Sequence, residues 1–292
     1  MPELPEVQTT VMGIKTKVLN RTFVDVWTDT KNLIKKPKDF SEFKKQIKNK
    51  KVKNVQRRAK NIIIDLSENY SLLIHQKMTG HLLFGKWKVI NKKWKPVDKK
   101  SLLNDPYNRF IHFILFLDNG KMLALSDSRK FAKIELWKTD ELLNSKEFKL
   151  LGPEPLEKSF NFKKFKKLFS NKKGRVKQVI MDPYFIAGIG NIYASEALWH
   201  AKIHPEKNVA NLKEKELKLL FLSIKKVLTL GVKLGGESFS DYRKPDGSKG
   251  DFDAERKAYK REGQKCFRCK GKIKRIKVAQ RSAFYCPNCQ RL

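Results

Sequence analysis

Apolar residues near the amino terminus recur at steps of three and four. This spacing places them on one side of a helix, so an amphipathic helix with one buried stripe is predicted. Pro2 and Pro5 fit this helix because both sit at or before its first turn, where no intrahelical donor is lost. The stripe consists of Leu4, Val7, Val11, Ile14 and Val18.

From about Arg21 to Trp137 the pattern changes to short strand-like runs. Asn119-Gly120 lies inside the last run and predicts a hairpin turn there. The Lys/Trp-rich stretch Lys86–Lys100 is expected to be an exposed loop. The region is therefore predicted to form one antiparallel β domain of two packed sheets. Its clearest runs are Lys60–Leu66, Ser71–Phe84 and Phe110–Asp127.

Helical spacing returns in the second half of the chain. Residues 139–160, which contain Gly152-Pro153-Glu154-Pro155, are expected to form an extended linker, because a proline restricts the residue before it. A later helix is predicted to start at Asn211, with Glu214 in the capping-box position, and to end before Gly231. Strands followed by helices favour an α+β protein of more than one domain.

A tight glycine turn is the other distinctive feature of this half. Gly188-Ile189-Gly190-Asn191 interrupts a helical stretch and is expected to open a helix over Ile192–Trp199, with Asn191 as its cap. The bare N–H groups of such a turn suit a phosphate. An ordinary helical corner would explain the same residues, and the turn alone does not choose between the two.

Length and composition narrow the classes of protein. The chain has 292 residues, 40% of them hydrophobic, which suits two domains, and no apolar run reaches membrane-spanning length. Lys and Arg outnumber Asp and Glu by 65 to 30, a formal net charge of +35. This excess favours nucleic acid through counterion release, although lysine-rich compositional drift would also contribute to it.

All four cysteines lie near the carboxyl end of the chain. Two Cys-x2-Cys pairs joined by a hairpin-length, Lys/Arg-rich stretch have the spacing of one structural, tetrahedral zinc site. Two disulfides in a secreted domain are the alternative, but no signal-peptide pattern is seen and no other cysteine is used. The basic stretch indicates a hairpin that faces DNA or RNA. The predicted zinc ligands are Cys266, Cys269, Cys286 and Cys289.

Pro2 is a candidate nucleophile. Removal of Met1, expected when a small residue follows it, would leave a secondary amine at the start of the chain. An α-amino group has a pKa of roughly 7.7–8 against about 10.4 for lysine, and the positive end of the following helix favours its neutral form further. A neutral amine can attack a sugar C1′ and form an iminium, with Glu3 moving protons. A plain helix start with a solvated glutamate is the alternative.

Seven motifs stand in one order along the chain, and in that order they closely resemble the formamidopyrimidine-DNA glycosylases. This bacterial family excises oxidised purines from DNA. The resemblance runs from Pro2 to Gln290, and its terminal motif and its cysteine motif are the most specific. The motifs are MPELPEV at residues 1–7, RAK at 58–60, HQKMTG at 75–80, DSRKF at 127–131, LGPEPL at 151–156, GIGNIYA at 188–194 and QRSAFYCPNCQ at 280–290.

The resemblance implies catalytic roles for four residues. Pro2 would be the Schiff-base nucleophile and Glu3 the acid that protonates the departing nucleoside. Lys60 would donate a proton in β-elimination, and Arg281 would serve δ-elimination and grip phosphate. Lys60 could instead be one of many surface lysines, and Arg129 and Lys172 solvated charges.

The resemblance also implies residues that contact DNA. Met78, Arg129 and Phe131 would enter the duplex and fill the gap left by a flipped base, since an apolar wedge replaces lost stacking. Met78 and Phe131 could instead be core residues. Lys172 and Asn191 would contact phosphates. The expected partner is double-stranded DNA that contains oxidised purines or abasic sites.

By the same resemblance the chain is an α+β, multidomain protein. Residues 1–138 would form an amino-terminal antiparallel β-sandwich with its flanking helix, and residues 139–160 a linker. Residues 161–262 would form a helix-two-turns-helix domain with a lesion-recognition loop at about 235–252, and residues 263–292 a zinc-finger β-hairpin. A monomer with one structural zinc is expected, in the bacterial cytoplasm at the nucleoid.

Two other functions remain as alternatives. An enzyme of the endonuclease VIII type, which removes oxidised pyrimidines, typically begins PEGPE and lacks the Met/Arg/Phe wedge. A non-catalytic zinc-finger protein that binds DNA would explain the charge and the cysteines, but it leaves Pro2, Glu3 and Lys60 without a role. The chain also departs from the family pattern at Gln76-Lys77, at Phe110, where a histidine is usual, and at Ala132, where glycine is usual.

Overall fold

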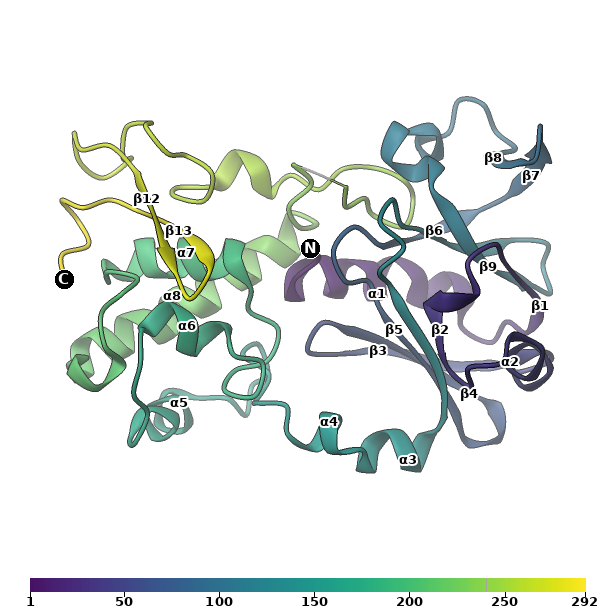
Figure 1. Ribbon diagram of the computed structural model, residues 1–292, viewed down its shortest axis with the longest axis horizontal. Coiled ribbons are helices and arrows are strands. Elements are labelled where there is room, and N and C mark those ends of the chain that lie inside the picture. Colours follow the sequence, from purple (N-terminus) through teal and green to yellow (C-terminus); the bar gives the residue numbers. More distant parts are fainter. Residues whose placement is uncertain (240) are drawn as a thin grey trace. The chain divides into compact units, whose positions relative to one another are not determined.

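The computed structural model describes residues 1–239 and 241–292 (Figure 1). The chain divides into two compact units. Unit 1 consists of Met1–Lys149 and Leu234–Asp253, and unit 2 of Leu150–Lys233 and Ala254–Leu292. The predicted loop at 235–252 therefore belongs to the same unit as the amino terminus, and residue 240 within it lies outside the described residues.

Unit 1 is built around helix α1 (Leu4–Val18) and two sheets, as predicted. In spatial order the four-stranded sheet contains β1 (Phe23–Thr28), β9 (Ile111–Leu117), β10 (Met122–Ser126) and β6 (His81–Gly85). The five-stranded sheet contains β2 (Ile34–Lys36), β11 (Lys133–Lys138), β5 (Tyr70–His75), β4 (Asn61–Leu66) and β3 (Val52–Arg58). Neighbouring strands are antiparallel except β2 and β11. Helix α2 spans Phe40–Ile47.

One apolar core joins α1 to both sheets. The predicted stripe of α1 is buried, and all its members except Leu4 belong to one cluster with residues such as Phe23 and Ile64. The predicted Asn-Gly turn connects β9 to β10, where Gly120 has φ of +70°. The run Ser71–Phe84 is two strands, β5 and β6, that belong to different sheets. Both strands are buried on both sides, so their residues form an apolar run without alternation. Such a run does not show where one strand ends and the next begins.

The prediction of a loop at Lys86–Lys100 was wrong in part. β7 (Trp87–Ile90) and β8 (Lys93–Pro96) form an antiparallel hairpin. Asn91 and Lys92 turn it with φ of +50° and +61°, which matches a two-residue turn. The sequence pattern does not predict these strands, because lysines fill most of the hairpin and its apolar side consists mainly of two tryptophans.

Unit 2 contains the predicted helices with different ends. The long helix α8 starts at Glu214 instead of Asn211 and runs past Gly231 to Lys233. Gly190, not Asn191, is the N-cap of α7, so Asn191 is the first residue of that helix. The α-helices of the unit are α5 (Phe162–Phe169), α6 (Val176–Met181), α7 (Asn191–Ala201) and α8 (Glu214–Lys233).

The predicted extended linker is partly helical. Its first half forms α3 (Thr139–Asn144) and α4 (Lys146–Lys149), both in unit 1, and its second half belongs to unit 2. The predicted carboxyl-terminal hairpin is present as β12 (Lys274–Val278) and β13 (Arg281–Tyr285). Among the described residues, no helix has the length and apolar character needed to cross a membrane.

Candidate active site and zinc finger

The amino terminus is held by a reciprocal cap on helix α1. Pro2 and Glu3 are buried, with Glu3 only 2% exposed. The backbone N–H of Glu3 donates to Oε2 of Glu6 at 2.7 Å, while the Glu3 side chain accepts from the backbone of Glu6. This capping box fixes the backbone of Glu3 and its carboxylate together. Met1 precedes Pro2 here, so the nitrogen of Pro2 is part of a peptide bond.

Glu6 also connects this terminus to the segment Leu234–Asp253. Its Oε1 accepts the backbone N–H of Glu237 at 2.8 Å, and its carbonyl oxygen accepts the Tyr242 hydroxyl at 3.0 Å. Burial raises the pKa of Tyr242, which keeps that hydroxyl protonated. Gly236 has φ of +84°, and a Cβ there would lie 2.8 Å from the Glu6 side chain. Glycine is thus required for this close approach.

The cavity beside Pro2 is almost filled in this arrangement. Its volume is about 10 Å³, room for about one water molecule. Glu237 and Tyr242 of the segment Leu234–Asp253 are among the residues that leave this space so small. The cavity is lined by Met1, Pro2, Glu6, Met78, Glu237 and Tyr242.

Lys60 lies in the two-residue turn of the β3–β4 hairpin, after Ala59 with φ of +54°. Arg57 supports this turn by donating to the Ala59 carbonyl at 2.8 Å, and it ties the hairpin to α1 by donating to Gln8 at 3.0 Å. Burial, together with the charges of Lys77 and Lys60, lowers the pKa of His75 to about 3. The neighbour of Lys60 is therefore a neutral imidazole at physiological pH.

Met78, Arg129 and Phe131 are displayed together at the surface of unit 1. Met78 is 38% and Phe131 52% exposed, and the Arg129 guanidinium lies 4.5 Å from the centre of the Phe131 ring. Their frame is Asp127, which is fully buried and accepts the backbone N–H groups of Phe131 and Ala132, both at 2.8 Å. Neither apolar side chain is a core residue, so the plain alternative fails for both.

Thr79 joins the loop of Met78 to the loop of Arg129. Its hydroxyl donates to Asp127 and accepts the backbone N–H of Arg129 at 3.2 Å. Sequence reasoning placed Asp127 and Glu6 in motifs but missed the role of Asp127 in holding these loops and the role of Glu6 in capping α1. The three-residue spacing of Glu3 and Glu6 was a signal that could have identified the capping box.

The departures from the family pattern have separate structural settings. Ala132 is buried in the core, and the Arg109 guanidinium lies 4.9 Å from the centre of the Phe110 ring. Gln76 is 1% exposed, and neither amide atom of its side chain has a hydrogen-bond partner among the described residues. We find no physical account of that buried amide in the surrounding residues.

Unit 2 brings Lys172 and Arg281 to one cationic cavity of about 430 Å³. Lys172 lies 3.9 Å from Asp182, and Arg281 follows the tight turn of the β12–β13 hairpin. Lys173 and Lys177 line the same cavity, so four basic residues surround it. Such a site suits a phosphate oxygen.

A buried ammonium fixes the hairpin next to this cavity. Lys177 donates to the Ser282 carbonyl at 2.7 Å and to the Ser195 hydroxyl at 3.0 Å. Ser195 in turn donates to the Asn191 carbonyl at 2.9 Å. Lys177, which is 1% exposed, thereby connects the backbone beside Arg281, through Ser195, to the backbone of Asn191.

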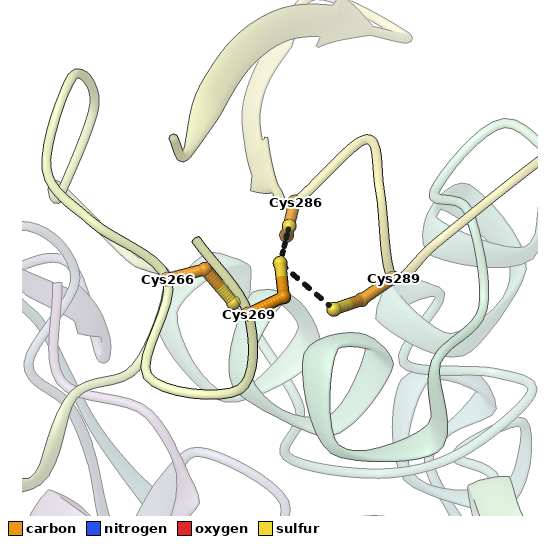
Figure 2. A group of neighbouring side chains, drawn as sticks. All are labelled: Cys266, Cys269, Cys286 and Cys289. Carbon is orange, nitrogen blue, oxygen red and sulfur yellow. Dashed lines mark hydrogen bonds between the residues drawn. The ribbon is translucent and has the colours of Figure 1, made fainter. Parts of the chain in front are cut away.

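The four cysteines converge on one point (Figure 2). Their sulfur atoms all lie within 4.8 Å of one another, and Cys269 Sγ lies 3.5 Å from those of Cys286 and Cys289. Tetrahedral zinc with Zn–S bonds of about 2.3 Å needs sulfurs about 3.8 Å apart. Backbone N–H groups of Arg268 and Gly271 donate to these sulfurs at 3.4 Å, as they do to thiolates. The donor set therefore fits zinc.

Family descriptions match successive parts of the chain. Residues 1–134 match the formamidopyrimidine-DNA glycosylase N-terminal domain, and residues 151–243 match the formamidopyrimidine-DNA glycosylase H2TH domain. Residues 263–292 match the zinc finger found in FPG and IleRS. The fold and these sites define a zinc-containing DNA-repair glycosylase with one structural zinc per chain.

Full-length relatives agree with this class. The formamidopyrimidine-DNA glycosylases of Pelotomaculum thermopropionicum and Rickettsia africae are each 37% identical to this chain. The first match covers 100% of each of the two sequences, and the second covers 99% of each. A complex between the Lactococcus lactis Fpg and DNA containing an abasic site has a TM-score of 0.85 at 30% identity, covering 99% of this chain and 100% of that one. The chain belongs to the formamidopyrimidine-DNA glycosylase family.

Proposed function

We propose that this enzyme removes oxidised purines, 8-oxoguanine and formamidopyrimidines, from duplex DNA through a Schiff base at Pro2. It then cleaves the abasic strand by β- and δ-elimination. The observation that carries the proposal is the buried Pro2-Glu3 terminus, which Glu6 fixes at the start of α1. The enzyme acts as a monomer in the bacterial cytoplasm, at the nucleoid.

The first step joins Pro2 to the sugar and releases the base. With Met1 removed, the Pro2 nitrogen bonds to C1′ of the damaged nucleoside as the bond from C1′ to the base breaks. Glu3 gives one proton and the Pro2 nitrogen loses its own, and these two protons go to the departing base and to the ring oxygen O4′. The bond from C1′ to O4′ breaks, and the opened sugar is left as an iminium on Pro2. The segment that fills the cavity beside Pro2 is displaced in this step, because the cavity is otherwise too small for a base.

Elimination follows from the iminium, which acidifies the neighbouring sugar proton. Loss of that proton expels the 3′ phosphate with Lys60 as proton donor, and a second elimination expels the 5′ phosphate with Arg281 assisting. Hydrolysis of the remaining imine frees Pro2. The zinc, when bound, stabilises the finger that carries Arg281, and four thiolates leave it no open position for substrate.

The DNA contacts of the proposal divide between the two units. Met78 and Phe131 replace the stacking of the extruded base, and Arg129 hydrogen-bonds its orphaned partner. Lys172 and Asn191 hold phosphates. Exposure of the first three side chains and the basic cavity at Lys172 support these assignments.

Borohydride reduction on an abasic duplex tests the proposal, because only an imine is trapped as a covalent adduct. Wild-type protein should trap, whereas Pro2→Gly or a residue added before Pro2 should abolish excision yet leave duplex binding largely intact. A residue added after Leu292 is the matched control and should trap normally. Normal trapping by the amino-terminally extended protein would remove Pro2 from the mechanism.

Lys60→Ala separates the glycosylase step from the lyase step. Excision of 8-oxoguanine should fall more than cleavage at a preformed abasic site, because Pro2 still forms the imine there. Equal losses on both substrates would instead mark Lys60 as a general binding residue.

A further inference from the structure

The β7–β8 region carries a charge that the active site does not explain. Between Lys86 and Lys100 there are seven lysines and one acidic residue, Asp98, and all seven lysines are exposed. None of their side chains forms an ion pair with another described residue. Four other lysines of unit 1 do form such pairs with described residues, among them Lys36 with Glu141 at 2.9 Å. The seven are Lys86, Lys88, Lys92, Lys93, Lys95, Lys99 and Lys100.

The hairpin is fixed to the sandwich by its aromatic side. Trp87 is 3% exposed and packs with Leu103 and Ile114, while Trp94 lies 5.3 Å from Trp27 between ring centres. Strand alternation then directs the other side of the hairpin away from these contacts. That side bears Lys88, Lys93 and Lys95, which we call the lysine face.

The charges of the lysine face lower the stability of the hairpin. Lys88 lies directly opposite Lys95 in the strand pairing, and like charges in this position are destabilising. A further lysine, Lys93, lies opposite Ile90 on the same side. A rigid surface with unneutralised, mutually repelling ammonium groups is complementary to a regular polyanion. Duplex DNA presents that polyanion to this enzyme.

Met78 and the β7–β8 hairpin lie at opposite ends of strand β6. Residues 76–80, with Met78, precede β6, and Ser126 of β10 pairs with His81 at that same end. The hairpin leaves β6 at the opposite end, after Gly85. Five residues of strand span about 17 Å. This distance corresponds to about five base pairs at 3.4 Å each.

We propose that the duplex runs along the direction of β6 and that the lysine face binds its phosphates about five or more base pairs away from the lesion. The inference rests on the proposed function, since it takes Met78 to mark the lesion position. The face adds affinity and extends the contacted length of DNA without touching the damaged nucleotide or the sugar that reacts.

The test compares two duplexes with a central tetrahydrofuran abasic analogue, one of about 11 base pairs and one of about 31. The variant Lys88→Gln/Lys93→Gln/Lys95→Gln removes the lysine face. Lys45→Gln/Lys51→Gln/Lys53→Gln is the matched control, because it removes three exposed lysines from the same unit. Replacing the lysine face with three arginines tests rescue by a group that also contacts phosphate.

On the long duplex the glutamine variant should bind more weakly, and its salt dependence should become shallower by about two to three in log–log slope. On the short duplex it should match the wild type, and the arginine variant should restore the long-duplex slope. The control should show no loss that depends on duplex length. Unchanged affinity on the long duplex, or an equal loss on both duplexes, would overturn the inference.

Borohydride trapping separates this inference from the proposed function. At saturating protein the glutamine variant should trap on an abasic 31-mer duplex as fully as the wild type, since no lysine of the face takes part in chemistry. Failure of the wild type to trap would contradict the proposed function, while the length comparison would still decide on the lysine face.

Discussion

Two lysine-rich hairpins of this enzyme are stabilised by different means. β7–β8 and β12–β13 are both short, and each is turned by two residues with positive φ, Asn91 and Lys92 in one and Ala279 and Gln280 in the other. The first packs tryptophans against a sheet. The second sits beside four cysteines. Similar local sequences thus depend on burial in one case and on a metal in the other.

The difference lies in how much apolar area each hairpin reaches. Around β7–β8, Trp87 and Leu103 join a cluster that includes strands β9 and β10. The cluster of the finger holds few large side chains apart from its cysteines, among them Trp199 and Phe284. A segment of this size cannot bury an adequate core, so bound zinc provides much of its folding free energy.

Zinc removal should give the largest effect and should break only one hairpin. Chelation, or Cys286→Ser, should unfold Cys266–Cys289, because structural zinc sites contribute about 10–16 kcal/mol at neutral pH. DNA affinity should collapse and the salt dependence of binding become shallower. Metal analysis measures the zinc content, and hydrogen exchange of the backbone amides measures the unfolding of each hairpin. Exchange in β7–β8 should not change, and absence of one zinc per chain would show that the finger is misread.

Trp87→Ala should break the other hairpin. Truncation of a buried tryptophan costs about 3–5 kcal/mol, and unit 1 should lose that stability while zinc content stays at one per chain. Urea unfolding measures the loss of stability, and metal analysis of the same samples measures the zinc content. Val89→Ala is the matched control, since Val89 is 57% exposed and should change stability by less than about 0.5 kcal/mol. A loss of zinc with Trp87→Ala would contradict the separation of the two hairpins.

Lys95→Glu should give the smallest effect and should sharpen the comparison. It turns the Lys88–Lys95 pair from repulsive to attractive, so stability should rise by about 0.2–1 kcal/mol at low salt and the gain should shrink at high salt. Lys99→Glu, which lies outside the strand pairing, should show no such gain. If Lys95→Glu lowers stability, the cross-strand pairing is misassigned.

Much of the fold could be predicted from periodicity and turn chemistry. The buried stripe of α1 and the β9–β10 turn follow from local spacing alone. The β7–β8 hairpin was missed because lysines interrupt its apolar residues, of which only the two tryptophans pack on the sheet, and an isolated segment does not show which sheet they reach. The start of α8 was misplaced because several polar residues near Asn211 can cap a helix.

The candidate site divides in a similar way. Residues in strong motifs, such as Pro2 and the cysteines, stand out in the sequence because their chemistry is unusual. Glu6 and Asp127 do not, because their importance comes from backbone groups that are distant in sequence or irregular in conformation, such as the N–H of Glu237. No residue pattern reports such partners before the chain is folded.

The central claim is that the Pro2 nitrogen is the atom that bonds to the sugar. Mass spectrometry of the proteolysed, borohydride-reduced adduct with abasic DNA tests it most directly. The account predicts a single modified peptide, the amino-terminal one, without Met1 and with the deoxyribose remnant on Pro2. An adduct on the peptide containing Lys60, or on an amino terminus that retains Met1, would contradict it.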